Sequence, residues 1–251
     1  MPDTPSIPII NPYGRKYYGY FGKLGEYQTE VKYLQTSFNI NQLDDIRLVD
    51  TIPGSNEWSV RELFQRGIDR KRVENEINDY FKSTDQQKFF NPLTVVLLPM
   101  TNNQVSQGVV ELGSLTDENQ INEGENDEYK IIEADEYYKF RIHKQASFSE
   151  LEINQNNVEL VAIDGQHRLT SLKQLKAELK DDKDHARLNQ VDFKNWNIPV
   201  ILLVFPMVPR ESADVLKSMR DVFVTINKQA KPPTHGPVSY THLRAHETRG
   251  N

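Results

Sequence analysis

The chain has 251 residues, of which 37% are hydrophobic and 26% are charged, and its formal net charge is −6. Such a composition is typical of a globular protein with enough apolar surface to bury a core. The sequence contains no cysteine, which excludes disulfides, thiolate metal sites and a cysteine nucleophile and is consistent with a cytoplasmic protein. Because the net charge is negative, any binding of DNA requires a local basic patch.

The two ends of the chain do not carry the pattern of a folded element. Residues 1–11 are rich in proline, lack the basic start and apolar run of a signal peptide, and are expected to be flexible. Residues 238–248 resemble the conceptual translation of a transposase-based sequencing adapter. We therefore expect residues 238–251 to be an artefact that packs against nothing, and the domain over residues 12–237 to be incomplete at its C-terminus. The apolar run 198–208 is too short to span a membrane, so no membrane partner is expected.

Residues 12–23 interleave aromatic and basic side chains. This pattern suits a surface that stacks bases and contacts phosphates, because aromatic rings and cations are what such surfaces use. It equally suits an amphipathic strand with its aromatic side chains on one face, and the strand is the favoured interpretation.

A helix is predicted over residues 59–81. Ser59 and Glu62 form a capping box, and apolar side chains then repeat at helical spacing. The opposite face of this predicted helix is basic, with Arg66, Arg70, Lys71 and Arg72.

The rest of the chain alternates strands and helices. An acidic exposed loop is expected over residues 111–128 and a polar linker over residues 181–197. Apolar runs predict strands, and leucines or other apolar residues at helical spacing predict helices. The predicted strands cover residues 90–100 (bounded by Pro92 and Pro99), 137–143, 158–163 and 198–205. One helix is predicted from the leucines between residues 169 and 179, and a final helix from the apolar stripe over residues 215–226, ending near Lys231. The alternation indicates a mixed α/β fold of the α+β kind.

The motif that carries chemistry is a turn between a buried strand and a helix, with the sequence Asp164-Gly165-Gln166-His167-Arg168. Glycine permits a tight turn that a residue with a Cβ resists. The first N–H groups of the helix that follows have no intrahelical partners, and the positive end of the helix dipole lies behind them. This geometry is a ready-made site for an anion such as phosphate.

Each polar side chain of the turn suits a role at such a site. Arg168 can hold phosphate with both arms of its guanidinium group, and His167 can donate a hydrogen bond to phosphate or move a proton. Asp164 can cap the helix, hold a divalent metal or orient His167, while Gln166 adds a neutral donor and acceptor. In the alternative interpretation the turn is an ordinary cap, with Asp164 as N-cap and Arg168 in solvent. We favour the functional interpretation, because the polar residues converge between one strand and one helix.

The turn resembles the signature of the DGQHR-domain family, to which DndB-like DNA sulfur modification proteins belong. The resemblance covers most of residues 12–234. It extends to Ile52-Pro53-Gly54-Ser55 with Trp58, residues 62–66, Phe90-Asn91-Pro92 and residues 227–232. The turn is also similar to the DGQQR signature of GmrSD-type restriction proteins, and more distantly to the Gly-x-x-Arg phosphate loop of ParB and sulfiredoxin.

The resemblance implies a ParB/sulfiredoxin-like domain with an N-terminal extension. It also implies a DNA-binding regulator or accessory protein of a DNA-modification system of the phosphorothioation type, or of a phage-defence system. The ligand of the turn would be DNA phosphate or a nucleotide, such as a nucleoside triphosphate with magnesium. The ligand-binding residues implied are Gly165, Gln166, His167 and Arg168, joined by Gln65, Arg66, Asn227 and Lys231. For Gln65 and Arg66 a solvated helix face is an equal alternative. For Asn227 and Lys231 the structural interpretation is favoured, because a lysine suits the end of a helix.

Two other functions stay open at this stage. The first is an enzyme, either a nucleotide hydrolase or a ParB-like nuclease, with Asp164 and His167 as its catalytic residues and Arg168 stabilising phosphoryl charge. No second carboxylate is placed in the sequence to complete a metal site, so no metal ligands are assigned. The second is a scaffold in which the turn has no ligand. The oligomeric state is left open.

Overall fold

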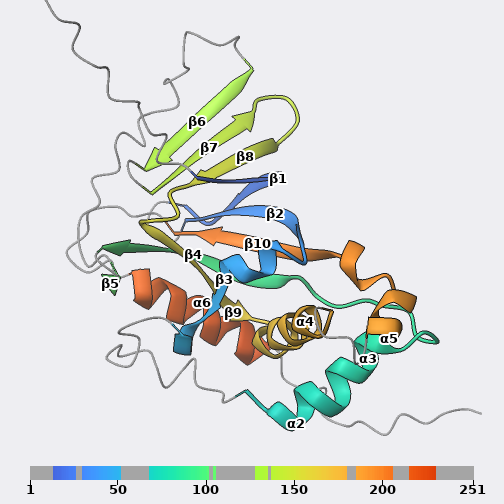
Figure 1. Cartoon of the computed structure of the whole chain (residues 1–251). Helices are drawn as coiled ribbons and strands as arrows, with labels where there is room; N and C mark the ends of the chain where they lie inside the picture. Colours follow the sequence, from blue (N-terminus) through green and yellow to red (C-terminus); the bar gives the residue numbers. More distant parts are fainter. Residues whose placement is uncertain are drawn as a thin grey trace, which may run out of the picture.

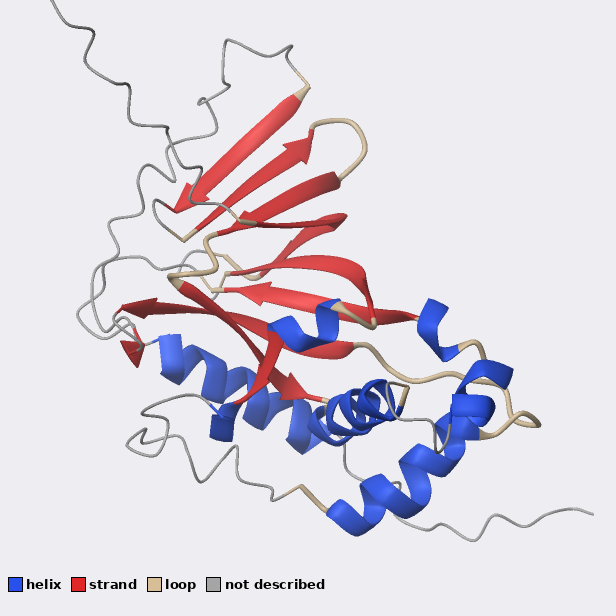
Figure 2. Cartoon of the chain, in the orientation of Figure 1, coloured by secondary structure: helices blue, strands red, loops and turns tan. Residues whose placement is uncertain are grey.

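The computed structural model describes residues 14–26, 30–51, 68–101, 104–105, 128–134, 137–179, 185–205 and 215–229. These residues form one mixed sheet with helices packed on it, as Figures 1 and 2 show. The strand order is β3-β9-β4-β10-β2-β1-β8-β7-β6, and the short β5 pairs with β4. The expected mixed α+β class is confirmed.

The strands are β1 (Arg15–Leu24), β2 (Val31–Asn39), β3 (Ile46–Leu48), β4 (Leu93–Thr101), β5 (Gln104–Val105), β6 (Tyr129–Ala134), β7 (Tyr138–His143), β8 (Phe148–Ile153), β9 (Val158–Asp164) and β10 (Asn197–Val204). The helical segments are η2 (Gln42–Asp45), η3 (Val49–Thr51), α2 (Arg70–Arg72), the π-helical η5 (Val73–Ile77), α3 (Asn78–Lys82), α4 (Gln166–Glu178), α5 (His185–Gln190), η6 (Phe193–Asn195) and α6 (Val215–Gln229). Among the described residues, no helix combines the length and the apolar character needed to cross a membrane.

The strands around β4 are buried on both faces. Val95 and Leu97 belong to the same apolar cluster as the leucines of α4, whereas Val96 and Leu98 belong to a second cluster with Phe223 of α6. A strand covered on both faces is apolar at successive positions, which explains the unbroken apolar run of β4. The pairs β4–β10 and β3–β9 are parallel, while β10, β2, β1, β8, β7 and β6 pair antiparallel in turn. The antiparallel strands extend away from the helices in Figure 1.

The predicted strand over residues 90–100 is confirmed, although it begins at Leu93 and continues through Pro99. The N–H of Met100 donates to Asn157 on the β9 side, so the nitrogen of Pro99 faces the β10 side. The paired register of β4 with β10 ends at Val96. Pro99 therefore removes no ladder hydrogen bond, and a proline inside a strand is tolerated in such a position.

Two other expectations need correction. The predicted helix over residues 59–81 is not continuous, because Ile68 and Asp69 are not helical and Asp69 is an N-cap whose side chain accepts from the N–H of Arg72. The helix found therefore starts at Arg70 and runs through α2, η5 and α3; residues 52–67 lie outside the described residues. The expected polar linker over residues 181–197 contains α5 and η6, which bury Leu188 and Phe193 completely.

The aromatic and basic stretch near the N-terminus forms β1, so its interpretation as a strand is confirmed. Its aromatic side chains lie on both faces rather than on one. Tyr17 is buried in the core and stacks on Phe38, whereas Tyr18 and Tyr20 are exposed and contact Phe148 of β8. The expected loop over 111–128 lies outside the described residues except at Glu128.

The helix of α2, η5 and α3 is joined to α4 by a buried polar cluster. Asn78 accepts a hydrogen bond from the hydroxyl of Ser171, which is fully buried, and donates to Gln174 at 3.2 Å. A buried hydroxyl that loses its hydrogen-bond partner lowers the stability of the fold, because it has been removed from water without compensation. This cluster therefore contributes to the position of the helix beside α4.

We expect Asn78→Ala to lower the free energy of unfolding by about 1–3 kcal/mol, because it leaves Ser171 without a partner. Adding Ser171→Ala should recover part of that loss, since both partners are then gone. Asn75→Ala, at an exposed position of the same helix, is the control and should have little effect. Chemical denaturation measures all variants; equal effects of Asn75→Ala and Asn78→Ala would contradict the assignment.

Candidate functional site

The predicted strand-to-helix turn is present. Strand β9 ends at Asp164, and Gly165 follows in the left-handed region, with φ 82° and ψ 20°. Gly165 is the N-cap of α4 and its carbonyl accepts from the N–H of Leu169 at 2.8 Å. No side chain caps the helix. The N–H groups of residues 166–168, in the first turn, therefore have no intrahelical partners and are available to an anion.

Asp164 does not cap the helix, contrary to the ordinary-cap interpretation. Its Oδ2 accepts from Nη2 of Arg168 at 3.0 Å, and Nη1 of Arg168 donates to the carbonyl of Asn91. Arg168 is therefore held at the turn rather than free in solvent, and 20% of its side chain is exposed. Burial lowers the pKa of Arg168, while the carboxylate of Asp164 acts in the opposite direction. The guanidinium ties the end of β9 to the segment that leads into β4.

His167 is oriented by Asp69, not by Asp164. The backbone N–H of Asp69 donates to Nε2 of His167 at 3.0 Å, so the neutral imidazole carries its proton on Nδ1. Burial lowers the pKa of His167, the positive charge of Arg72 lowers it further, and Asp69 acts in the opposite direction. His167 is therefore held neutral as an acceptor at the junction of two helices.

A pocket of about 680 Å³ opens at the start of α4. Its polar lining consists of all five residues of the turn with Arg72 and Glu76. Its apolar lining is largely aromatic and consists of Ile77, Tyr80, Phe81, Phe90, Ile163 and Phe223. The size and the mixture of a few polar groups with aromatic side chains are those of small-molecule sites in proteins.

The pocket contains residues that the sequence did not indicate as a site. Arg72 and Glu76 come from the helix that begins at Arg70, and Phe223 comes from α6. The apolar repeat of the last helix is a signal of packing, so it gave no reason to place Phe223 at a ligand. Arg72 belonged to a basic helix face, which is usual for a solvent-exposed side of a helix. Gln166, by contrast, was predicted; its amide nitrogen donates back to Ala162 of β9 at 3.3 Å.

Several predicted site residues are not part of the described structure. Gln65, Arg66 and Lys231 lie outside the described residues, as do residues 1–11 and 238–251. Asn227 lies on α6, but its side chain is not described. The expected approach of Gln65 and Arg66 to the turn thus stays a prediction, although Asp69, further along the same segment, does contact His167.

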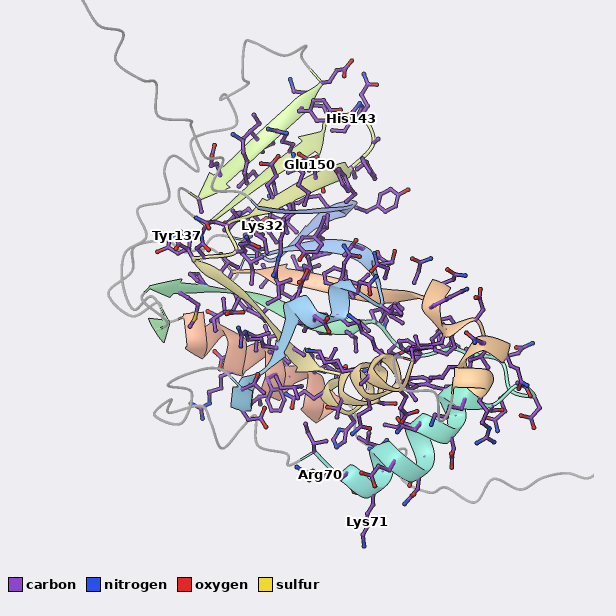
Figure 3. The ribbon with its side chains drawn as sticks, viewed as in Figure 1. Lys32, Arg70, Lys71, Tyr137, His143 and Glu150 are labelled. Carbon is purple, nitrogen blue, oxygen red and sulfur yellow. The ribbon has the colours of Figure 1, made fainter. Side chains whose placement is uncertain are left out.

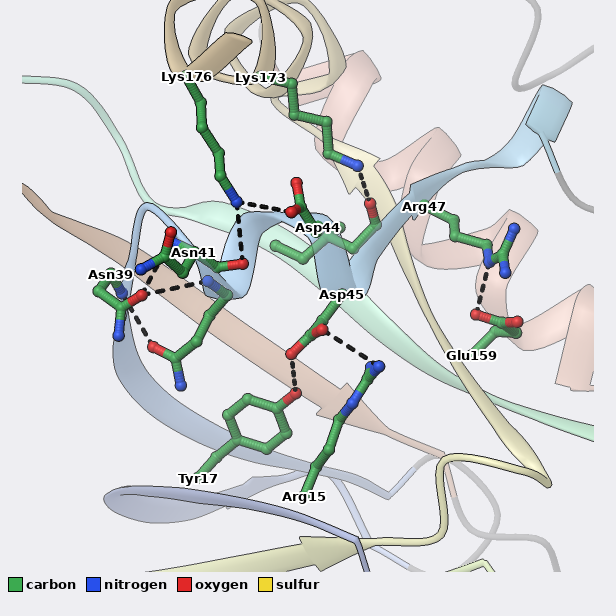
Figure 4. Close-up of polar contacts among 12 residues, drawn as sticks. Arg15, Tyr17, Asn39, Asn41, Asp44, Asp45, Arg47, Glu159, Lys173 and Lys176 are labelled. Carbon is green, nitrogen blue, oxygen red and sulfur yellow. Dashed lines mark hydrogen bonds and ion pairs between the residues drawn. The ribbon is translucent and has the colours of Figure 1, made fainter. Parts of the chain in front are cut away.

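Lysines on α4 hold this helix over the sheet behind the turn (Figure 4). Nζ of Lys176 contacts Asp44 at 2.6 Å and the carbonyl of Asn41 at 3.3 Å, and Nζ of Lys173 donates to the carbonyl of Ile46 at 2.6 Å. Burial lowers the pKa of Lys173. These contacts fix α4, and the residues at its start line the pocket.

In the part of the chain that the structure describes, no three histidine, aspartate or glutamate side chains gather as metal ligands do. The carboxylates that line the pocket are Asp164 and Glu76. Comparison with known proteins gives no match for the chain among protein-family models, curated proteins or solved structures.

Gly165→Ala is expected to destabilise the turn. A Cβ at this position would lie 2.6 Å from Cδ2 of Leu93 and 2.9 Å from Nη2 of Arg168, and it would strain the left-handed backbone. We expect a loss of about 1–3 kcal/mol in the free energy of unfolding, measured by chemical denaturation. Gly25→Ala is the control, because Gly25 also has a positive φ of 75° but lies exposed after β1. A loss no larger than that of the control would show that the contacts around Gly165 do not matter.

The protonation of His167 should depend on Arg72. Because the folded protein binds this proton less readily than the unfolded chain, the stability it contributes is full above the ordinary histidine pKa and falls as the pH drops through the lowered value. A titration followed by NMR should place the pKa of His167 below its ordinary range, and Arg72→Gln should raise it. Arg70→Gln, which removes an exposed cation outside the pocket lining, should change it less. Equal shifts in both variants would contradict a local effect of Arg72.

Proposed function

We propose that the protein is a DNA-binding regulator or accessory protein of a DNA-modification or phage-defence system, and that the pocket at the start of α4 binds the phosphate of DNA or of a nucleotide. The observation that carries this proposal is the pocket itself, which brings the five residues of the turn together with Arg72. The resemblance of the turn to DGQHR-domain proteins, DndB among them, supports the proposed role in a DNA-modification or phage-defence system. A ParB/sulfiredoxin-like fold belongs to the same proposal.

The charges around the pocket favour an anion. The start of α4 presents unpaired N–H groups and the positive end of the helix dipole. Arg168 and Arg72 add two positive charges to the lining, and their partners there are the carboxylates of Asp164 at 3.0 Å and of Glu76 at 3.7 Å. A neutral His167 has its Nδ1–H left as a donor, because Nε2 already accepts from Asp69. These groups can bind a phosphate from several sides.

Asp164 competes with a bound phosphate for the guanidinium group of Arg168. It holds Nη2 of Arg168 at 3.0 Å, so a phosphate has to replace or share this carboxylate as the partner of Arg168. The negative charge of Asp164 also opposes an anion in the pocket. Binding is therefore weaker than the other groups of the site alone would allow, and it can be released when the carboxylate regains the guanidinium.

The aromatic residues of the lining suit the base of a nucleotide. Tyr80, Phe90 and Phe223 line the pocket together with the polar turn. Stacking of a base on an aromatic side chain contributes about 1–3 kcal/mol and tolerates any base. A ligand that carries both a phosphate and a flat ring thus matches the polar and the aromatic parts of the lining.

An enzyme that hydrolyses a nucleotide or a phosphodiester is the alternative function. It is favoured by the presence of Asp164, His167 and Glu76 around one pocket. Two carboxylates and the phosphates of a nucleoside triphosphate are a donor set that suits magnesium, which would supply charge neutralisation when bound. The pairing of Asp164 with Arg168 makes the binding function the better supported one.

Variants of Arg168 test the phosphate site. We expect Arg168→Ala to weaken ATP or DNA binding by about ten- to a hundredfold, since a charged hydrogen-bond partner contributes about 1.5–3 kcal/mol. Arg168→Lys should recover only part of the affinity, because an ammonium group cannot make the two-armed contact. Arg187→Ala, an exposed arginine of α5, is the control. Wild-type affinity in Arg168→Ala, measured by calorimetry on folded protein, would contradict the proposal.

Asp164→Asn separates the binding function from the enzyme. If the protein is a binding protein, the variant should bind ATP or DNA at least as tightly as the wild type, because a competing negative charge is gone and a neutral amide holds Arg168 less tightly than a carboxylate does. Neither form should then turn over ATP in the presence of magnesium. If the protein is an enzyme, the wild type should hydrolyse ATP or cut DNA and the variant should lose this activity while it still binds. A phosphate-release assay and a gel assay for cleavage measure the difference.

A further inference from the structure

A basic turn stands at the start of the helix beside the pocket. It consists of Arg70, Lys71 and Arg72, the first three residues after the N-cap Asp69. All three side chains are exposed. In Figure 3, Arg70 and Lys71 lie at the end of this helix, and Lys71 extends away from the ribbon. The basic turn is therefore open to a partner.

Positive charges at the start of a helix destabilise that helix when no partner is bound. The start of a helix carries the positive end of the dipole, so cations there destabilise it. Within the described residues, Arg70 and Lys71 make no ion pair, and Arg72 has a contact of 3.7 Å with the exposed Glu76. Asp69 uses its carboxylate to cap the N–H of Arg72, and the next carboxylate along the helix is that of the exposed Glu74.

Basic side chains on the sheet, in contrast, often have an acidic partner. Many of them are matched by a carboxylate on a neighbouring strand, as in the pairs Lys16–Glu152, Arg47–Glu159, Lys139–Glu133 and Arg141–Glu150. Local rules of stability are broken mainly where a protein has a function to serve. Cations that the chain does not neutralise at a helix start thus indicate an anionic partner.

The basic turn is continuous with the pocket. The N–H of Asp69 donates to His167 at 3.0 Å, which brings the starts of the two helices together. Arg72 belongs to both, because it is the last residue of the basic turn and lines the pocket. A chain of phosphates that places one member in the pocket can therefore place its neighbours on the basic turn.

We propose that the basic turn contacts the backbone of duplex DNA that passes over the pocket, so that the pocket takes one phosphate of this polymer, while ATP can occupy the pocket alone and does not reach the basic turn. This inference rests on the proposed function, namely that the pocket binds phosphate. The partner has to be a polyanion, because a single small anion in the pocket leaves Arg70 and Lys71 without a role. The basic turn is also the local basic patch that a chain of net charge −6 needs to approach DNA.

The test compares a double variant, Arg70→Gln with Lys71→Gln, with the wild-type chain. The probes are a labelled DNA duplex of about two helical turns, followed by fluorescence anisotropy at several salt concentrations, and ATP, followed by calorimetry. We expect the double variant to bind the duplex about tenfold or more weakly at low salt and to lower the slope of log K against log salt by about two. Its affinity for ATP should change by less than twofold, because neither residue lines the pocket.

The matched control is a second double variant, Lys130→Gln with Lys144→Gln. It removes the same charge from exposed residues on β6 and on the turn between β7 and β8, which Figure 1 shows at the opposite end of the molecule from α2. This control should bind the duplex like the wild type. A loss equal to that of the Arg70/Lys71 variant would mean that overall charge alone matters, and it would overturn the inference.

The remaining outcomes separate the inference from the proposed function. If the wild type binds ATP but the Arg70/Lys71 variant binds the duplex unchanged, the inference fails and the phosphate site stands. If the wild type binds neither probe, the proposed function fails as well.

Polyglutamate is added as a competitor in a separate experiment. Displacement of the duplex at equal charge concentration would point to an acidic protein partner and overturn the inference. The melting temperature of the Arg70/Lys71 variant should be equal to or above that of the wild type, because unfavourable charges at a helix start are removed.

Discussion

The left-handed backbone at Gly165 is the constraint on which the candidate site depends. It turns the chain from β9 into α4 within one residue, with φ 82°, and leaves no space for a Cβ between Leu93 and Arg168. Because the turn is this tight, the N–H groups of the first turn of α4 emerge directly at the end of a buried strand. The side chain of Arg168 can then reach back to Asp164 and across to the carbonyl of Asn91, which joins β9 to the segment before β4.

The sheet provides the rigid support for this turn. Strand β9 lies between β3 and β4, and its side chains belong to apolar clusters on both faces, one shared with α4 and one with α6. A strand held from both faces cannot shift or tilt without opening packed contacts. The lysine contacts of α4 to residues around η2 and β3 fix the helix in the same frame. The site is therefore built on regular elements, which position functional groups more sharply than loops do.

Positive charges gather at the candidate site, whereas the net charge of the whole chain is negative. The chain is acidic overall, yet the junction between the start of α4 and the start of α2 collects Arg72, Arg168, the unpaired N–H groups of α4 and the exposed Arg70 and Lys71. The effect is visible in His167, whose pKa is lowered by burial and by Arg72. Asp164 and Glu76, the carboxylates of the pocket lining, moderate this positive potential. A local positive site on an acidic protein favours selective over general attraction of anions, because the rest of the surface repels them.

The sequence by itself determined the local features of this protein, and tertiary structure decided the rest. The apolar run of β9, the glycine at the turn and the leucines of α4 are signals between neighbouring residues, so the strand-turn-helix unit was predictable. The interruption of the predicted helix at Asp69 was missed, because a capping aspartate inside an amphipathic pattern carries only a weak local signal. The partners of the turn residues were not predictable either. Arg168 meets Asn91 across 77 positions and His167 meets Asp69 across 98 positions, and such contacts depend on how the sheet and helices pack. For the same reason, the apolar repeat of Ile77, Tyr80 and Phe81 indicated a packing face, and only the folded chain brought that face to the motif and made it the wall of a pocket.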